Sequence, residues 1–236
     1  MSKFLIVGMI GAGKSSTGNT LIGANAFTRG LDLNAITRQC SHAISKDQSM
    51  LIIDTPGFGD LRDRNLFLTA LKNYETQIQN LLPLNGLLLV VKFIGNKSES
   101  FERSVEYFIE AFESSSLKSL MLICIQAGVK YDDEQFKGIL FNSNGYKYLK
   151  SKNNGQDIQY CLWDNLEPYA EQIQSFNERI KYLTQIDRPA LGSMSCSVEN
   201  QLRKQSSLVY QLENSNSLFI YAFLILIIGV LAFLFY

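Results

Sequence analysis

The sequence predicts an α/β fold in which a mostly parallel sheet has helices on both faces, followed by a hydrophobic helix at the C-terminus. Short apolar runs of strand length alternate with longer segments whose apolar residues recur at helical spacing. This alternation is typical of parallel sheets, in which a helix connects each strand to the next. A glycine-rich turn after the first run and a charge-free stretch at the end of the chain complete the evidence for this prediction.

The expected strands are short apolar runs bounded by turn residues. They lie at 3–7, 50–53, 87–93, 120–125 and 158–163. The first run stops at glycines, as a buried strand does before a tight turn, and the residues after Lys14 are expected to form the first helix. A second helix is expected at 101–112. The segment 166–183 has apolar residues three and four positions apart, which predicts a closing helix with one apolar face.

The chain is expected to divide into a globular domain and a membrane tail. The domain is predicted at 1–186, and the Pro-, Gly- and Ser-containing segment 187–217 is interpreted as a linker and juxtamembrane segment. The last nineteen residues, 218–236, contain no charged side chain. A helix of this length crosses a bilayer core of about 30 Å at about 1.5 Å per residue. The sequence therefore predicts a transmembrane tail anchor.

The N-terminus, the cysteines and the net charge indicate where the domain lies and which classes of ligand the composition disfavours. The N-terminus lacks the apolar helix and cleavage site of a signal peptide, so we expect a single-pass C-terminal anchor with the domain in the cytosol. Four cysteines without a CxxC pair and one histidine indicate reduced thiols and no zinc site. With 22 basic and 22 acidic residues, the chain lacks the broad positive field of a nucleic-acid-binding protein. The sequence does not indicate which membrane receives the anchor.

A phosphate-binding motif of the form GxxxxGK[ST] follows the first expected strand and opens the first expected helix. In this setting backbone N–H groups and the helix N-terminus surround a phosphate. Lys14 is expected to contact the β- and γ-phosphates, and the Ser15 hydroxyl to bind Mg²⁺. The predicted nucleotide contacts are Gly8, Met9, Ile10, Gly11, Ala12, Gly13, Lys14, Ser15 and Ser16.

A second motif, Asp54-Thr55-Pro56-Gly57, follows the expected strand at 50–53. The carboxyl ends of parallel strands are where ligands bind in α/β proteins. Asp54 is therefore expected to hold the magnesium shell, and the Gly57 N–H to contact a γ-phosphate. This motif at this distance after a phosphate-binding loop is typical of the GTPase branch of P-loop proteins.

Three stretches, 13–23, 36–40 and 54–57, resemble the avirulence-induced, immunity-associated (GIMAP-like) GTPase family, a group of septin-related GTPases of which many are membrane-anchored. The resemblance covers roughly residues 3 to 185. It implies that Thr37 binds Mg²⁺ and contacts the γ-phosphate, so that the metal ligands would be Ser15, Thr37 and Asp54. It also implies GTP or GDP with Mg²⁺ as ligands, and dimers or oligomers, with itself or a related chain, formed through the nucleotide face.

Recognition of the base rests on two segments. Trp163-Asp164-Asn165 resembles the family's aromatic-Asp-Asn box, which implies that Asn165 hydrogen-bonds guanine and Trp163 flanks it, although a lone tryptophan after a strand is more often a core residue. The box after the strand at 120–125 either lacks its acidic residue or, slipped along the chain, supplies Lys130 and Asp132 as a K-x-D pattern. In the second case Asp132 would accept hydrogen bonds from guanine. Asn96-Lys97-Ser98-Glu99 follows the preceding strand and is interpreted as a decoy.

Phe58 follows Gly57, where Ras-like enzymes have the glutamine that orients water, so slow hydrolysis is expected. We assign no catalytic residue. The sequence therefore indicates a membrane-anchored guanine-nucleotide-binding protein that binds and slowly hydrolyses GTP. The alternative is a nucleotide-binding membrane scaffold with little hydrolysis and relaxed guanine specificity. An ATP-using protein would require the Thr37 and Asp54 motifs to be accidental.

Overall fold

The structure, a computed structural model, contains a six-stranded sheet in the part of the chain that it describes. The described residues are 1–28, 37–58, 66–74, 77, 80–81, 83–94, 99–112, 114–127, 131–165 and 170–183. The strands are β1 (Ser2–Val7), β2 (Ser41–Ile44), β3 (Met50–Asp54), β4 (Gly86–Ile94), β5 (Leu120–Ala127) and β6 (Gln159–Trp163). They lie in the order β2-β3-β1-β4-β5-β6, and every neighbouring pair is parallel except β2 with β3. The expected mostly parallel sheet is confirmed.

The edge strand β2 was not among the expected strands. Its four residues are largely exposed and include a serine and a histidine, so they form no apolar run. The strand is held by antiparallel pairing with β3, in which Ser41 lies opposite Asp54. This pairing brings the chain that follows Thr37 to the carboxyl end of β3.

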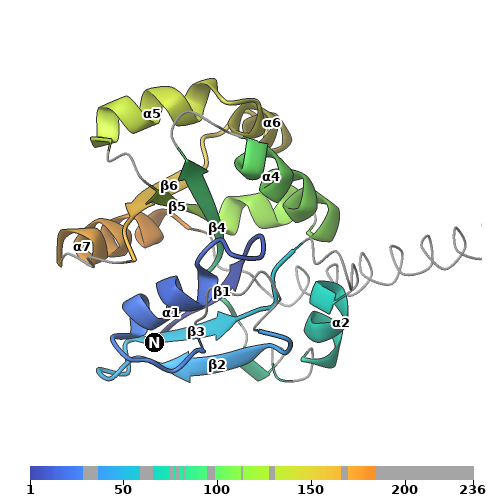
Figure 1. The fold of residues 1–236 in the computed structure, drawn as a ribbon, viewed down its shortest axis with the longest axis vertical. Helices are drawn as coiled ribbons and strands as arrows, with labels where there is room; N and C mark the ends of the chain where they lie inside the picture. Colours follow the sequence, from blue (N-terminus) through green and yellow to red (C-terminus); the bar gives the residue numbers. More distant parts are fainter. Residues whose placement is uncertain are drawn as a thin grey trace, which may run out of the picture. The chain divides into compact units, whose positions relative to one another are not determined.

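Helices cover both faces of the sheet (Figure 1). The helices are α1 (Lys14–Ile22), α2 (Leu66–Asn73), α4 (Glu99–Ala111), α5 (Asp133–Asn142), α6 (Asn144–Lys152) and α7 (Ala170–Arg179). In Figure 1, α1 and α7 lie on one side of the strands, and α2, α4 and α6 lie on the other. The expected placement of helices on both faces is confirmed.

Contacts along β4 show the same division. Val90 belongs to the apolar core that includes Ile22 of α1 and Phe176 of α7. Phe93, three residues later, lies on the opposite face of the strand. Its ring centroid is 5.3 Å from that of Phe101 in α4. The sheet therefore has a buried layer on each side, which fixes the positions of the loops at its carboxyl edge.

Helices α2, α5 and α6 were missed in the sequence. The break between α5 and α6 lies at Ser143, which ends one helix and caps the next. The Ser143 hydroxyl accepts a hydrogen bond from the Tyr146 N–H at 3.2 Å. An N-cap of this kind satisfies a backbone donor that a helix leaves free, so the chain forms two short helices separated by one residue.

The predicted linker, 187–217, and tail anchor, 218–236, lie outside the described residues, as does the start of the expected closing helix at 166–169. Within the described part of the chain, no helix combines the length and the apolar character that crossing a bilayer requires. The anchor therefore stays a prediction.

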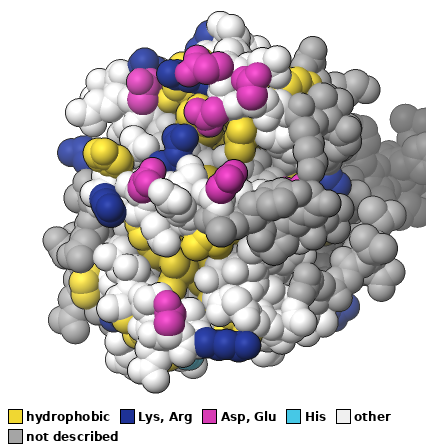
Figure 2. Space-filling model, turned by 90° about the vertical axis from the view of Figure 1, so that its left-hand side faces the viewer, with side chains coloured by type: hydrophobic (Ala, Val, Ile, Leu, Met, Phe, Trp, Pro, Cys, Tyr) yellow, Lys and Arg dark blue, Asp and Glu magenta, His cyan; other side chains and the backbone are white. Residues whose placement is uncertain are grey.

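On the face of the domain shown in Figure 2, basic and acidic side chains are interspersed.

Candidate phosphate- and metal-binding site

The glycine-rich turn joins β1 to α1 at the carboxyl edge of the sheet. Gly8 has φ +147°, and a Cβ there would lie 2.3 Å from the Val90 carbonyl oxygen of β4. Gly13 has φ +101°, and a Cβ there would lie 2.7 Å from Cδ1 of Ile125. Both positions require glycine because of the backbone angle and because of the neighbouring atoms. The turn therefore packs directly on β4 and β5.

Lys14 begins α1 with its side chain turned back over this loop. Its Nζ donates a hydrogen bond to the Met9 carbonyl at 3.1 Å, and the residue is only 7% exposed. Burial lowers the pKa of the Lys14 ammonium to about 8, while the nearby Asp54 carboxylate acts in the opposite direction. Among the described residues this ammonium makes one hydrogen bond, to a neutral carbonyl, which leaves donors free for an anion.

The three residues predicted to bind magnesium lie together. The Ser15 hydroxyl donates to Oδ2 of Asp54 at 2.7 Å, and its oxygen lies 3.3 Å from Oγ1 of Thr37. They come from the start of α1, the end of β3 and the chain before β2. The group therefore depends on the sheet topology that places these segments at one edge.

Asp54 retains an unused acceptor within this group. Its Oδ1 is buried and has no hydrogen-bond partner among the described residues. Burial raises the pKa of Asp54, opposed first by the hydrogen bond from Ser15 and then by the charge of Lys14. Mg²⁺ prefers carboxylate and other hard oxygen ligands, and an orphaned buried carboxylate oxygen requires an explanation. One carboxylate and two hydroxyls therefore fit a magnesium ion that also keeps water or phosphate ligands.

The chain after Asp54 is joined to the phosphate-binding loop. The Phe58 N–H donates to the Gly8 carbonyl at 2.9 Å, and the Ile10 N–H donates to the Phe58 carbonyl at 3.2 Å. Gly57 is so close to this loop that a Cβ would lie 2.6 Å from the Ile10 nitrogen. We call these contacts between Gly8, Ile10, Gly57 and Phe58 the Phe58 clasp.

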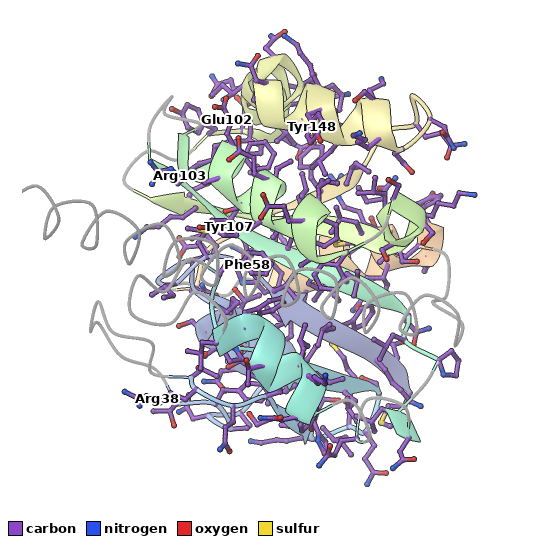
Figure 3. All side chains as sticks on the ribbon, turned by 90° about the vertical axis from the view of Figure 1, so that its right-hand side faces the viewer. Arg38, Phe58, Glu102, Arg103, Tyr107 and Tyr148 are labelled. Carbon is purple, nitrogen blue, oxygen red and sulfur yellow. The ribbon has the colours of Figure 1, made fainter. Side chains whose placement is uncertain are left out.

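The Phe58 side chain extends away from the loop into an aromatic cluster. It is 2% exposed, and its ring centroid lies 4.5 Å from that of Phe67 in α2. Its ring also stacks on Tyr107 of α4, with ring centroids 6.0 Å apart. Both residues are labelled in Figure 3. The residue after Gly57 therefore fills a hydrophobic position between two helices and offers no polar group to water.

The predicted base-binding residues Trp163 and Asn165 are in direct contact. The Trp163 Nε1–H donates to Oδ1 of Asn165 at 3.0 Å. Trp163 is 1% exposed and packs in the core against Phe176, which favours the core position named as its alternative, and its contact with a base stays a prediction. An indole with a satisfied N–H is stable in such a position. Trp163 therefore acts on the site through Asn165.

Asp132, the other predicted base contact, caps α5. Its Oδ1 accepts a hydrogen bond from the Gln135 N–H at 2.8 Å. Gln126, near the end of β5, makes two hydrogen bonds to the backbone of Tyr131. Its Nε2 donates to the Tyr131 carbonyl, and its Oε1 accepts from the Tyr131 N–H. Residues 128–130 lie outside the described residues, as do Asn96, Lys97 and Ser98 of the decoy motif. The contact of Asp132 with a base stays a prediction.

Thr17 was missed by the sequence analysis. It is fully buried, and its hydroxyl donates to Oδ1 of Asn165 at 3.3 Å. Its place in the first turn after Lys14 was visible in the sequence, but a polar side chain inside a helix gives no sign of a partner at the other end of the chain. The contact spans 148 positions along the chain.

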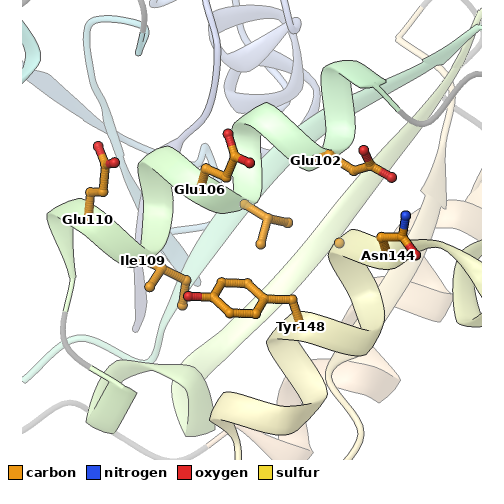
Figure 4. A pocket seen from close by; sticks show the side chains of 8 residues that line it. Glu102, Glu106, Ile109, Glu110, Asn144 and Tyr148 are labelled. Carbon is orange, nitrogen blue, oxygen red and sulfur yellow. The ribbon is translucent and has the colours of Figure 1, made fainter.

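A separate hollow of about 330 Å³ lies between α4 and α6 (Figure 4). Its lining comes from those two helices and consists of Glu102, Val105, Glu106, Ile109, Glu110, Asn144, Gly145 and Tyr148. None of these residues belongs to the phosphate, metal or base positions described above. The hollow is therefore not part of the candidate site.

The chain is similar to known proteins over most of its length. The family model of the AIG1 family matches residues 2–213. GTPase IMAP family member 8 from Rattus norvegicus is 26% identical over 195 residues, covering 77% of this chain and 26% of that protein. Immune-associated nucleotide-binding protein 3 from Arabidopsis thaliana is 38% identical over 226 residues, covering 89% of this chain and 66% of that protein. The chain thus spans a quarter to two thirds of the length of these relatives.

Among solved structures, one of the chloroplast translocon components atToc33 and psToc159 has a TM-score of 0.53 at 20% identity, with 70% of each chain covered. At this identity the likeness is one of fold. The family match covers nearly all of the described domain and includes the glycine-rich loop, Thr37 and Asp54. The chain belongs to the AIG1 family.

Proposed function

We propose that this protein is a membrane-anchored GTPase that binds GTP with Mg²⁺ at the β1–α1 loop and hydrolyses it slowly. The observation that carries the proposal is the group formed by Ser15, Thr37 and Asp54, in which the buried Oδ1 of Asp54 has no hydrogen-bond partner among the residues that the structure describes. The names of the AIG1 relatives, a GTPase and a nucleotide-binding protein, support the choice of ligand.

Different groups of the site are proposed to bind different parts of the nucleoside triphosphate and its metal ion. The backbone N–H groups at the start of α1 would bind the phosphates, because no side chain caps this helix at Gly13 and occupies them. Lys14 supplies a buried positive charge, and Ser15, Thr37 and Asp54 would hold the magnesium ion. When bound there, the ion neutralises phosphate charge and orients the γ-phosphate.

Hydrolysis is proposed to be slow because the residue after Gly57 is apolar and buried. Phe58 supplies no group that can orient an attacking water. The direct experiment is steady-state release of phosphate from GTP and from ATP by the purified full chain. Slow release from GTP supports the proposal, whereas preferential release from ATP contradicts it. Tight GTP binding with no release would favour the scaffold alternative.

Dimerisation across the nucleotide face is part of the proposal. Its support comes from the atToc33 and psToc159 study, which reports that dimerisation is important for the GTPase activity of those proteins. We expect a larger molar mass with a GTP analogue than with GDP, measured by light scattering on the detergent-solubilised chain. The same mass in both nucleotide states would contradict this part of the proposal.

Removal of residues 215–236 should release the protein from membranes. The apolar segment 218–236 is expected to be the anchor and to be separate from the phosphate site. The truncated chain should appear in the supernatant after a carbonate wash, with unchanged nucleotide affinity. The full chain, treated in parallel, should stay in the pellet. A truncated chain that still resists the carbonate wash would rule out the anchor.

The role of Asp132 can be tested without loss of the α5 cap. Asparagine is as good an N-cap as aspartate, so Asp132→Asn preserves the contact with the Gln135 N–H. If Asp132 accepts hydrogen bonds from guanine, the variant should bind GTP about 10- to 150-fold more weakly, corresponding to about 1.5–3 kcal/mol. It should also gain affinity for xanthosine triphosphate. Identical competition profiles for GTP, ATP and xanthosine triphosphate in both proteins would reject the contact.

A further inference from the structure

A partly buried polar contact joins the segment after β6 to the first turn of α1. Oδ1 of Asn165 accepts hydrogen bonds from Trp163 Nε1 at 3.0 Å and from the Thr17 hydroxyl at 3.3 Å. The indole N–H can only donate, so the atom that faces it must be the amide oxygen. The orientation of the Asn165 amide is therefore set, with its nitrogen turned toward the phosphate-binding loop.

The amide nitrogen of Asn165 reaches this loop at Gly13. Nδ2 lies 3.5 Å from the Gly13 carbonyl oxygen, which also accepts the Thr17 N–H at 2.8 Å. A Cβ on Gly13 would lie 2.9 Å from the same Nδ2. Asn165 thus contacts both the last residue of the loop and the first turn of the helix.

The contact of Asn165 lies at the N-terminus of α1, which no side chain caps. Gly13 is the N-cap of α1 and supplies no side chain, and the first turn contains no acidic residue. A capping side chain would occupy the backbone N–H groups that a phosphate needs. Asn165 instead supports the turn from the side, through the Thr17 hydroxyl and the Gly13 carbonyl, and leaves those N–H groups free.

We propose that Asn165, held by Trp163 and Thr17, is a positioning residue for the phosphate-binding loop. It orients the first turn of α1 for phosphate whichever base the nucleotide carries. The inference rests on the proposed nucleotide binding and adds a role that does not depend on contact with the base.

The decisive probe is inorganic tripolyphosphate with Mg²⁺, which has the phosphates of GTP but no base. Thr17→Val keeps the shape of the side chain and removes one hydrogen bond. It should weaken the binding of both GTP and tripolyphosphate by the same factor, about 2- to 10-fold, as measured by calorimetry. Asn165→Ala should weaken tripolyphosphate binding by a larger factor than Thr17→Val does, and GTP binding by at least that factor, because it removes every contact of the amide.

Tyr146→Phe is the matched control. It also removes a buried polar group, since the Tyr146 hydroxyl contacts Asp157 and Ile158, but it lies in α6 on the other face of the sheet. Its unfolding temperature should fall while tripolyphosphate affinity stays unchanged. This comparison separates positioning of the loop from a general loss of stability.

Two results would overturn the inference. If Asn165→Ala weakens GTP binding but leaves tripolyphosphate binding unchanged, Asn165 acts on the base. If Thr17→Val changes neither, the contact is structural. Should tripolyphosphate bind too weakly to titrate, amide hydrogen exchange of the first turn of α1 decides, and unchanged exchange in Thr17→Val rejects the inference. A wild-type protein that binds no GTP would instead refute the proposed function, and this inference with it.

Discussion

Replacement of Lys14 by methionine should reduce GTP affinity by more than about 100-fold, because Lys14 is expected to contact both the β- and γ-phosphates and each charge-assisted contact contributes about 1.5–3 kcal/mol. The fold should persist. Lys14→Met relieves the cost of a buried ammonium, although it also removes the positive charge that favours the ionised form of Asp54. Since these effects on stability oppose each other, the unfolding temperature of the nucleotide-free protein should change little. Calorimetry with GTP and a thermal unfolding scan measure the two quantities.

Lys150→Met provides the control for this prediction. Lys150 of α6 forms an exposed ion pair with Asp157 at 2.7 Å, and surface pairs contribute little to stability. Its removal should leave GTP affinity unchanged. Full GTP affinity in the Lys14 variant would show that the glycine-rich loop does not bind phosphate.

Asp54→Asn should abolish the increase in unfolding temperature that Mg²⁺ causes in the presence of GTP. In the wild-type protein we expect Mg²⁺ to raise the unfolding temperature in the presence of GTP, and chelation by EDTA to remove that increase. The variant lacks the carboxylate and should show the same unfolding temperature with Mg²⁺ and with EDTA. Its GTP affinity in Mg²⁺ should fall to about the value that the wild type has in EDTA.

Without nucleotide or metal, the same variant should be more stable than the wild type. Burial raises the pKa of Asp54, so the ionised carboxylate is disfavoured in the folded protein. This penalty is absent at low pH, where the carboxyl is protonated in both states. It grows as the pH rises through the ordinary carboxyl pKa toward the raised one. Glu106→Gln on the exposed side of α4 is the control, and a Mg²⁺ response retained in Asp54→Asn would disprove the metal site.

The predictable parts of the fold are those whose structure is determined by residues close together in the sequence. The strands β1, β3, β4, β5 and β6 are buried and therefore appear as apolar runs, and the glycines of the first turn have no substitute at their backbone angles. The edge strand β2 has no such signal, since its stability comes from pairing with β3. Helices α5 and α6 were missed because one serine both ends the first and begins the second.

The candidate site was predictable in composition but less so in geometry. Lys14, Ser15 and Asp54 follow from motif and strand order, whereas Thr37 was reached only through the family resemblance. The burial of Trp163 and the unpartnered Oδ1 of Asp54 depend on how distant segments pack. No sequence pattern reveals such contacts, because they join residues far apart in the chain.

The Phe58 clasp has a mechanical consequence. Phe58 is held by its backbone to the phosphate-binding loop and by its ring to α2 and α4. Its backbone cannot move away from Gly8 and Ile10 without drawing a buried phenyl ring out of the cluster, and exposing such a ring costs about 1.5–3 kcal/mol. Tyr107, which stacks on that ring, is 39% exposed. A displacement of the phosphate-binding loop that moved Phe58 would therefore disturb the packing of a surface residue, Tyr107.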